Sequence, residues 1–361
     1  MTHHPHRGAD AAQPEAGASA QSGTKDSGCA SSQAKIDINR LVKSLVAYRK
    51  PSASRGWYEL AVTFVPFVAL MACMMWGVAE GYYAALVFTP LAGLLLLRMF
   101  IIQHDCGHGA FMPRKRDNDR IGRVIGVLTL TPYDCWKRSH ELHHAGTGNL
   151  DARGFGDVDT LTVREFQALS PLKRFGYRLY RHPVTLLGLG PAYLFLLRHR
   201  LPIGLMRAGS RYWISAMATN MATLALLFAV SWQFGLAAVL LVFLPTLICA
   251  ATVGVWLFYI QHQFETTHWE PRKQWSFKEA ALHGSSYLDL PTPMRWFTGG
   301  IGIHHIHHLM SQIPFYRLYE ALNAHPELAN VNRITARQTI TPFLLALWDE
   351  DARKMVRFRD I

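Results

Sequence analysis

Two stretches of the chain repeat the histidine spacing H-x-x-H-H. One copy runs from His140 to His144 (HELHH) and the other from His304 to His308 (HHIHH). Positions i, i+3 and i+4 lie on one side of a helix, so each copy is predicted to point three imidazoles at one place. A third stretch, His104 to His108 (HDCGH), adds an i, i+4 pair. Imidazole binds zinc, copper, iron and nickel, so the three stretches predict a metal centre.

The number of histidines exceeds the needs of a single ion. The three stretches supply eight, and His262 is a ninth candidate because it follows an apolar run as His104 does. A structural zinc ion takes four ligands, so nine rings predict two ions, each with four or five imidazoles and room for an exogenous ligand. The candidate ligands are His104, His108, His140, His143, His144, His262, His304, His307 and His308.

The elements that must position these histidines are mostly membrane helices. About 20 apolar residues span a bilayer as a helix, and four runs qualify, at about residues 60–79, 82–102, 212–232 and 236–260. The second run leads into His104 and the fourth into His262. We therefore expect an all-α integral membrane protein with four transmembrane helices in two hairpins. Residues 103–211 and 261–361 form its helical cap, which carries the metal site.

The distribution of basic residues predicts the orientation in the membrane. Of 37 Lys and Arg residues, 8 precede the first run, 17 lie between Gln103 and Arg211, and 11 follow Ile260. Basic residues gather on the cytoplasmic side, so the termini and the metal site are expected there. Arg98, near the end of the second run, is expected to snorkel to the interface. The net charge of +12 comes with no nucleic-acid recognition element, which favours anionic lipid or an acidic protein as partner.

The remaining segments are assigned from composition and spacing. Residues 1–34 contain no Ile, Leu, Val, Phe, Trp or Tyr, so they are predicted to be a disordered tail without a secretory signal. Residues 35–361 are predicted to form the functional domain. Residues 36–47 are predicted to be an interfacial helix, and residues 184–197 a surface-lying or re-entrant segment. Two C-terminal helices are expected at about residues 316–324 and 335–356. Gly299, Gly300 and Gly302 are expected to allow close backbone packing before His304.

The depth of the site points to a lipid substrate. An amphiphile can keep its polar end at the interface while its apolar chain enters between the helices. Hydrolysis of such a lipid would favour zinc with a carboxylate base, whereas attack on an unactivated C–H bond needs a redox metal and dioxygen. The histidine spacing alone does not choose between these two chemistries.

The three histidine stretches, with one hairpin before the first and another before the last, resemble the histidine boxes of the membrane-bound fatty acid desaturase family. The resemblance covers about residues 57–318. It implies two iron ions, O2 activation and removal of two hydrogens from adjacent methylenes of an acyl chain. The stretches HDCGHGAF and YIQHQFE further resemble bacterial members that act on acyl lipids, of the omega-6 or Delta-12 branch. The resemblance thus implies a bacterial inner-membrane enzyme, and a separate donor, a ferredoxin or a cytochrome b5-type protein.

Four carboxylates near the histidines could orient imidazole rings from behind, or could be solvated charges. They are Asp105, Glu141, Asp157 and Glu265. His305 occupies a position that the spacing leaves free and is excluded from the ligands, and His268 is interpreted as a bystander.

Two other functions remain open at this point. A di-iron hydroxylase or ketolase acting on alkanes, sterols or carotenoids would carry similar histidine boxes. A metal transporter or sensor would need ionisable residues within its spans, and the four apolar runs have almost none.

Overall fold

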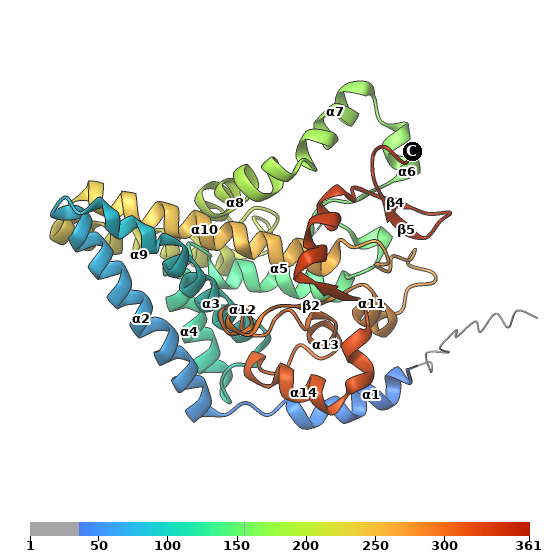
Figure 1. The fold of residues 1–361 in the computed structure, drawn as a ribbon, viewed down its shortest axis with the longest axis horizontal. Coiled ribbons are helices and arrows are strands. Elements are labelled where there is room, and N and C mark those ends of the chain that lie inside the picture. Colours follow the sequence, from blue (N-terminus) through green and yellow to red (C-terminus); the bar gives the residue numbers. More distant parts are fainter. Residues whose placement is uncertain (1–35, 155) are drawn as a thin grey trace, which may run out of the picture. The chain divides into compact units, whose positions relative to one another are not determined.

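Four long apolar helices form the framework of the protein (Figure 1). The computed structural model describes residues 36–154 and 156–361, so the predicted tail of residues 1–34 lies outside the described residues. The four helices are α2 (Ala53–Ala79), η2 with α3 (Tyr83–Phe88 and Thr89–His108), α9 (Ser210–Phe234) and α10 (Leu236–His262). Each is long and apolar enough to cross a membrane. The chain is therefore an integral membrane protein with its spans in two hairpins, as predicted.

Helix α3 lies between its neighbours and packs against α2, α4 (Lys115–Leu128) and α10. Gly93 permits the close approach of α3 to α10, because a Cβ added there would lie 2.8 Å from Cys249 Sγ. The two helices run on beyond their apolar portions and end at His108 and His262. Their packing therefore brings together the helix ends that carry candidate ligands.

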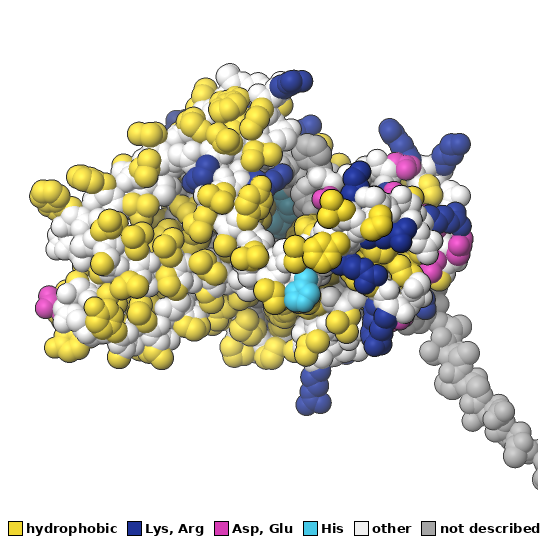
Figure 2. Space-filling model, turned by 90° about the horizontal axis from the view of Figure 1, so that it is seen from above, with side chains coloured by type: hydrophobic (Ala, Val, Ile, Leu, Met, Phe, Trp, Pro, Cys, Tyr) yellow, Lys and Arg dark blue, Asp and Glu magenta, His cyan; other side chains and the backbone are white. Residues whose placement is uncertain are grey.

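The surface divides into an apolar part and a charged part. Hydrophobic side chains cover the part of the molecule built from the long helices, whereas Lys and Arg gather over the remainder (Figure 2). Large apolar side chains on the outer faces of the spans are exposed, including Val65, Trp76, Leu224 and Phe228. This division is expected of a protein whose spans face lipid and whose cap faces water.

The cap is built from short helices. Those before the third span are α1 (Ile38–Leu45), η1 (Val46–Tyr48), α4, α5 (Tyr133–Gly146), η3 (Leu150–Ala152), α6 (Val163–Ala168), α7 (Pro171–Tyr180), the π-helical η4 (Thr185–Leu189), α8 (Gly190–Ala192), the π-helical η5 (Tyr193–Leu197) and η6 (Arg198–Arg200). Those after the fourth span are α11 (Phe277–His283), α12 (Thr292–Phe297), α13 (His304–Leu309), η7 (Phe315–Arg317), α14 (Leu318–Ala324), η8 (Pro326–Asn330) and η9 (Ala336–Leu344).

Five short strands complete the cap. Strands β1 (Leu161–Thr162), β4 (Leu347–Asp349) and β5 (Lys354–Val356) form one sheet in the order β1-β4-β5, and β2 (Tyr287–Asp289) pairs in parallel with β3 (Arg333–Thr335). The predicted helix at residues 335–356 is wrong, since only residues 336–344 are helical. Its apolar residues instead pair as strands, because β1 supplies the backbone partners that favour an extended chain.

Two smaller predictions are corrected by the packing. Helix α1 was expected to lie on the membrane, but its apolar residues Leu41 and Leu45 are buried, and Ser44 contacts His325 of the cap at 3.2 Å. Arg98 was expected to snorkel to the interface, yet it is only 2% exposed and pairs with the buried Glu59 of α2. Arg98 lies inside the second predicted span, whereas Glu59 lies just before the first, in the part of α2 that extends it.

Residues 184–197 do not form a fifth span. They form the run η4–α8–η5, which packs along α10, and Thr252 of α10 donates a hydrogen bond to the carbonyl of Leu187 (2.8 Å). Leu189, Tyr193 and Leu197 on the same run are exposed. The segment therefore packs against α10 and is not among the helices long and apolar enough to cross a membrane, while its expected surface-lying or re-entrant placement stays a prediction.

Candidate metal centre

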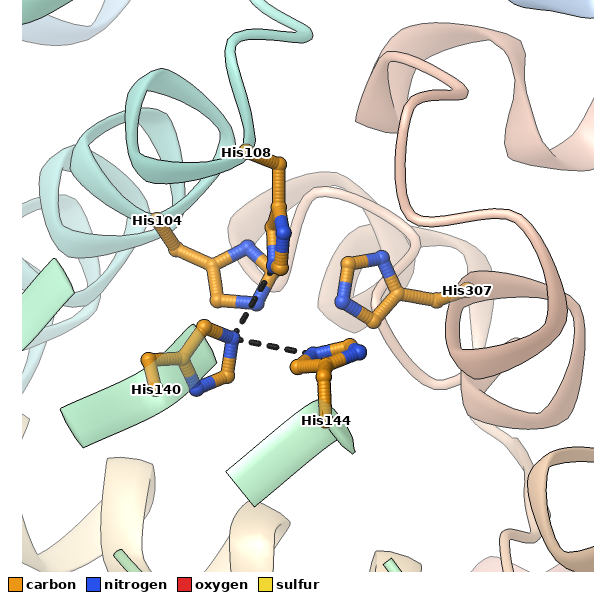
Figure 3. Close-up of side chains that lie close together, drawn as sticks. All are labelled: His104, His108, His140, His144 and His307. Carbon is orange, nitrogen blue, oxygen red and sulfur yellow. Dashed lines mark hydrogen bonds between the residues drawn. The ribbon is translucent and has the colours of Figure 1, made fainter. Parts of the chain in front are cut away.

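The nine predicted histidines lie together in two adjacent clusters. The five-ring cluster contains His104, His108, His140, His144 and His307 (Figure 3), and the four-ring cluster contains His143, His262, His304 and His308. Within each cluster, one nitrogen of every ring lies within 4.8 Å of the others. The rings of His144 and His308 stack between the clusters, with centroids 4.0 Å apart. The two groups therefore share one interior and contain five and four imidazoles, the numbers predicted from the sequence.

Each H-x-x-H-H stretch divides its rings between the clusters, which corrects the expectation that its three imidazoles converge on one point. His140 and His144 of α5 join the five-ring cluster, while His143 joins the other. Helix geometry explains the division, because residues i and i+4 differ by about 40° around the axis whereas i+3 lies about 60° to the other side. In α13 the order is reversed, with the i, i+4 pair in the four-ring cluster and His307 in the five-ring cluster.

Contacts between α3 and α5 position the five-ring cluster. The hydroxyl of Tyr133 donates to the carbonyl of Cys106 (2.8 Å), which joins the start of α5 to the end of α3. Gly107 allows this approach, since a Cβ there would lie 2.9 Å from the ring of Trp136. The Trp136 ring in turn stacks on His140, with centroids 4.6 Å apart. A bulky residue at Gly107 would therefore displace Trp136 and, with it, His140.

Backbone hydrogen bonds hold α13 against the end of α10. The carbonyl of Ser286 accepts from the N–H groups of His304 (3.1 Å) and His305 (3.3 Å), and the N–H of Ser286 donates to the carbonyl of Gln261 (3.0 Å). Gly302 is required by close packing, as predicted, because a Cβ there would lie 2.5 Å from the carbonyl oxygen of Leu288. These contacts fix the first ring of α13 beside the last ring of α10.

The ring nitrogens fit a cation at each cluster. The Nε2 atoms of His140 and His108 are 3.0 Å apart, and those of His304 and His262 are also 3.0 Å apart. Two neutral imidazole lone pairs repel each other at this separation unless a proton or a metal ion lies between them. His307 is buried, and neither of its ring nitrogens has a hydrogen-bond partner among the described residues. This donor set suits a borderline metal such as iron or zinc.

Burial keeps these imidazoles neutral. It lowers the pKa values of His140, His144, His304, His307 and His308 well below 6.5, and neighbouring imidazoles lower them further. Metal binding requires a neutral imidazole with a free lone pair. The rings are therefore in the protonation state that a metal ion needs near pH 7.

Two of the four predicted carboxylates lie behind histidine rings. Asp157 Oδ1 is 2.5 Å from His143 Nδ1, and Asp105 Oδ1 is 3.3 Å from His104 Nδ1. The structure does not bring the other two to the clusters. Glu141 is exposed and contacts Arg138 at 3.5 Å, and Glu265 is exposed in the loop that follows α10. A carboxylate behind a ligating imidazole fixes its tautomer and its orientation.

His305 and His268 lie outside both clusters. His305 is buried on the other side of α13, where its Nε2 lies 3.1 Å from the carbonyl oxygen of Leu328. His268 is half-buried and lies 3.8 Å from Glu270. Both positions agree with the sequence-based expectation that these histidines are not ligands.

Two residues that the sequence analysis did not single out support the site. Trp136 stacks on His140, and its position four residues earlier on α5 is the signal that could have revealed the contact. The second is Arg181, whose buried guanidinium donates to Tyr259, to Gln263 and to the carbonyl of Leu345. Because its partners are distant in sequence, no local pattern predicts the contacts of Arg181, which join the C-terminal segment to the end of α10.

Comparisons with known proteins agree with this arrangement. The fatty acid desaturase family profile matches residues 80–338. A fatty acid desaturase of Bacillus subtilis is 40% identical over 322 residues, which cover 89% of this chain and 91% of the relative. An sn-1 acyl-lipid omega-3 desaturase (ferredoxin) of Synechocystis is 29% identical and covers 83% of both chains, and an sn-1 oleoyl-lipid 12-desaturase of the same organism is 24% identical and covers 74% of both.

Proposed function

The chain belongs to the fatty acid desaturase family, whose members are O2-dependent oxidoreductases, and from this premise we propose its substrate, metal and partners. The substrate is an acyl chain carried by a membrane lipid, and two iron ions bind to the nine histidines. One observation carries the proposal: two histidine clusters meet where the spans α3 and α10 leave the apolar part of the molecule. An acyl chain entering between the helices would reach this depth while its head group stays at the interface.

The residues around the five-ring cluster suit an apolar substrate. The rings of His108 and His140 are half-buried, whereas all four rings of the other cluster are buried. A series of aromatic contacts leads away from His140, first to Trp136 and then to Phe100, whose ring centroid is 5.3 Å from that of Trp136. Phe195 continues the series at 6.1 Å from Phe100. These apolar walls would bind methylenes and exclude water beside the cluster.

The reaction is balanced by an external reductant. Removal of one hydrogen from each of two adjacent methylenes yields a double bond and releases two electrons and two protons. Dioxygen takes up four electrons and four protons to give two water molecules, so two further electrons and two protons must be supplied. Two iron ions at the clusters would supply the O2 activation that an unactivated C–H bond requires. The protein residues hold the ions, orient their imidazoles and keep the acyl chain beside them.

The electron donor is a separate protein on the cytoplasmic side. Three of the similar desaturases carry the word ferredoxin in their names, which favours ferredoxin over a cytochrome b5-type donor for this chain. The cap carries most of the Lys and Arg residues, which by the positive-inside rule supports a cytoplasmic location for the cap, the metal site and both termini in a bacterial cell. Its basic surface suits an acidic ferredoxin.

The test is expression in a bacterium that lacks this activity, with lipids analysed as methyl esters and double bonds located by mass spectrometry. New unsaturated acyl chains on glycerolipids are expected from the native chain, and about two iron ions per chain in the purified protein. Oxygenated products would instead indicate a hydroxylase or ketolase, and protein that binds no iron would contradict the proposed centre. A double bond twelve carbons from the carboxyl end is expected if the omega-6 or Delta-12 resemblance holds.

A further inference from the structure

The ion pair between Arg98 and Glu59 is unusual because both residues are only 2% exposed and belong to the candidate span helices α2 and α3. Burying such a pair brings little net stability, since desolvation offsets the attraction. Ionisable groups inside membrane helices usually serve a function. Arg98 and Glu59 are not part of the two histidine clusters, so their function must be another one. The carboxylate of Glu59 also binds Arg55 at 2.7 Å, and Arg98 Nε donates to Thr63 (3.1 Å), so α2 holds the guanidinium in one place.

The guanidinium of Arg98 also reaches the cap. It donates to the carbonyl of Trp296 in α12, and it lies 4.1 Å from the Trp296 ring centroid and 5.2 Å from that of Phe315. Phe315 begins η7, shortly after the third histidine stretch. Arg98 is therefore a point where the first membrane hairpin contacts the segments on both sides of α13.

The contacts continue from Phe315 to a candidate metal ligand. The N–H of Phe315 donates to Asp105 Oδ2 (2.6 Å), while Asp105 Oδ1 lies 3.3 Å from His104 Nδ1. Arg98 and Asp105 are seven residues apart on α3, so they lie on one side of the helix, two turns apart. An unbroken series of contacts thus runs from Glu59 through Arg98, Phe315 and Asp105 to His104.

We propose that Arg98 is a positioning residue for the five-ring cluster. Held by Glu59, it fixes Phe315 so that the backbone N–H of Phe315 orients Asp105, which in turn fixes the imidazole of His104. The inference rests on the proposed function, since it assumes that the clusters bind metal ions. It assigns to a buried ion pair between two span helices an effect on metal binding rather than on the assembly of the helices alone.

The experiment uses the full chain in lipid nanodiscs, stripped of metal and titrated with Co²⁺. The number of ions bound, their affinities and the visible absorption spectrum are measured together with the thermal unfolding midpoint. In Arg98→Met we expect one of the two ions to bind about 10-fold more weakly, with a changed spectrum for that ion. The same change is expected in Asp105→Asn, and the double variant should show no further loss, because both act through one series of contacts.

Arg200→Met is the matched control. Arg200 is also a partly buried arginine beside a span, donating to Asn220 Oδ1 (2.8 Å) and to the backbone carbonyls of Leu130 and Phe195. None of these contacts leads to Phe315 or Asp105, and the Phe195 ring, which faces Phe100, takes no part in them. This variant should unfold at a lower temperature but bind both ions with the native spectrum. If Arg98→Met does not fold, Arg98→Lys replaces it, since lysine keeps the charge beside Glu59 and loses the planar fork that reaches Trp296.

Each outcome decides the matter. Native affinity and spectrum in the folded Arg98 variant would overturn the positioning role, as would additive losses in the double variant. A native chain that binds no ions would instead overturn the proposed metal site, which separates the two failures.

Discussion

The two histidine clusters are built from the same three stretches yet differ in number, burial and support. The five-ring cluster has two half-buried rings, and a carboxylate, Asp105, lies 3.3 Å behind one of the others. The four-ring cluster is fully buried, and Asp157 approaches one of its rings to 2.5 Å. One cluster thus has one more imidazole and contact with the surface, whereas the other has fewer rings, all of them buried, and a closer carboxylate. The difference teaches that identical ligand types need not give equivalent sites.

The largest effect is expected from loss of a ring in the four-ring cluster. His143→Ala leaves three imidazoles in the cluster and removes the ring that Asp157 contacts. Product formation should therefore fall by more than about 100-fold, which exceeds the loss typical of removing a carboxylate behind a metal ligand. His140→Ala leaves four rings in its cluster and should still bind both ions, although the ion in that cluster should bind more weakly. Lipid analysis and metal content of the two purified variants provide the comparison. Equal losses in both would show that the fifth ring is not spare.

Acid is expected to destabilise the metal-free protein. The pKa values of five buried histidines, His140, His144, His304, His307 and His308, are lowered by burial below the unfolded value of about 6.5. Below that pH the unfolded chain takes up protons that the folded chain does not, so stability is lost as pH falls. Each histidine contributes up to about 1.4 kcal/mol per pH unit. Unfolding midpoints of metal-free protein measured from about pH 7.5 to about pH 5.5 should fall steadily, and a flat profile would contradict the folded-state burial.

Removal of the carboxylate behind His143 should weaken one ion. In Asp157→Asn the His143 ring loses a negative partner at Nδ1, so the affinity of the four-ring cluster for Fe²⁺ or Co²⁺ should fall toward the upper end of the usual 10- to 100-fold range. Glu141→Gln is the control, because Glu141 is exposed and contacts only Arg138 among the described residues. A similar loss in both variants would mean that general charge, and not the contact at Nδ1, determines the affinity.

A smaller effect is expected from Asp105→Asn in the five-ring cluster. Four other rings remain, and the distance from Asp105 to His104 is longer, so the affinity should fall by about 10-fold or less. Glu265→Gln, at an exposed carboxylate, should leave both ions unchanged. Metal titration of the two variants beside Asp157→Asn ranks the three carboxylates. A larger loss in Asp105→Asn than in Asp157→Asn would reverse the proposed difference between the clusters.

The sequence predicts the spans and the set of clustered histidines because both depend on local patterns. Long apolar runs specify membrane helices, and the exit of α3 and α10 from those runs places His104 and His262. Helix geometry also explains why the three rings of each H-x-x-H-H stretch are divided between the two clusters. This division can be recognised only once the two clusters have been located. The partners of Arg98 and the strand pairing of β4 could not be predicted, since both depend on residues distant in sequence. Arg98 pairs with Glu59 and Trp296 instead of reaching the interface, and residues 347–349 pair with β1 and β5 instead of forming a helix.

The sharing of α5 and α13 between the clusters has a consequence for biosynthesis. Neither cluster is complete without a ring from α13, which follows both membrane hairpins in the chain. A nascent polypeptide therefore cannot close either site until both hairpins and α13 have been synthesised. Metal binding at either cluster must then follow the synthesis of α13, so both sites become complete at the same stage.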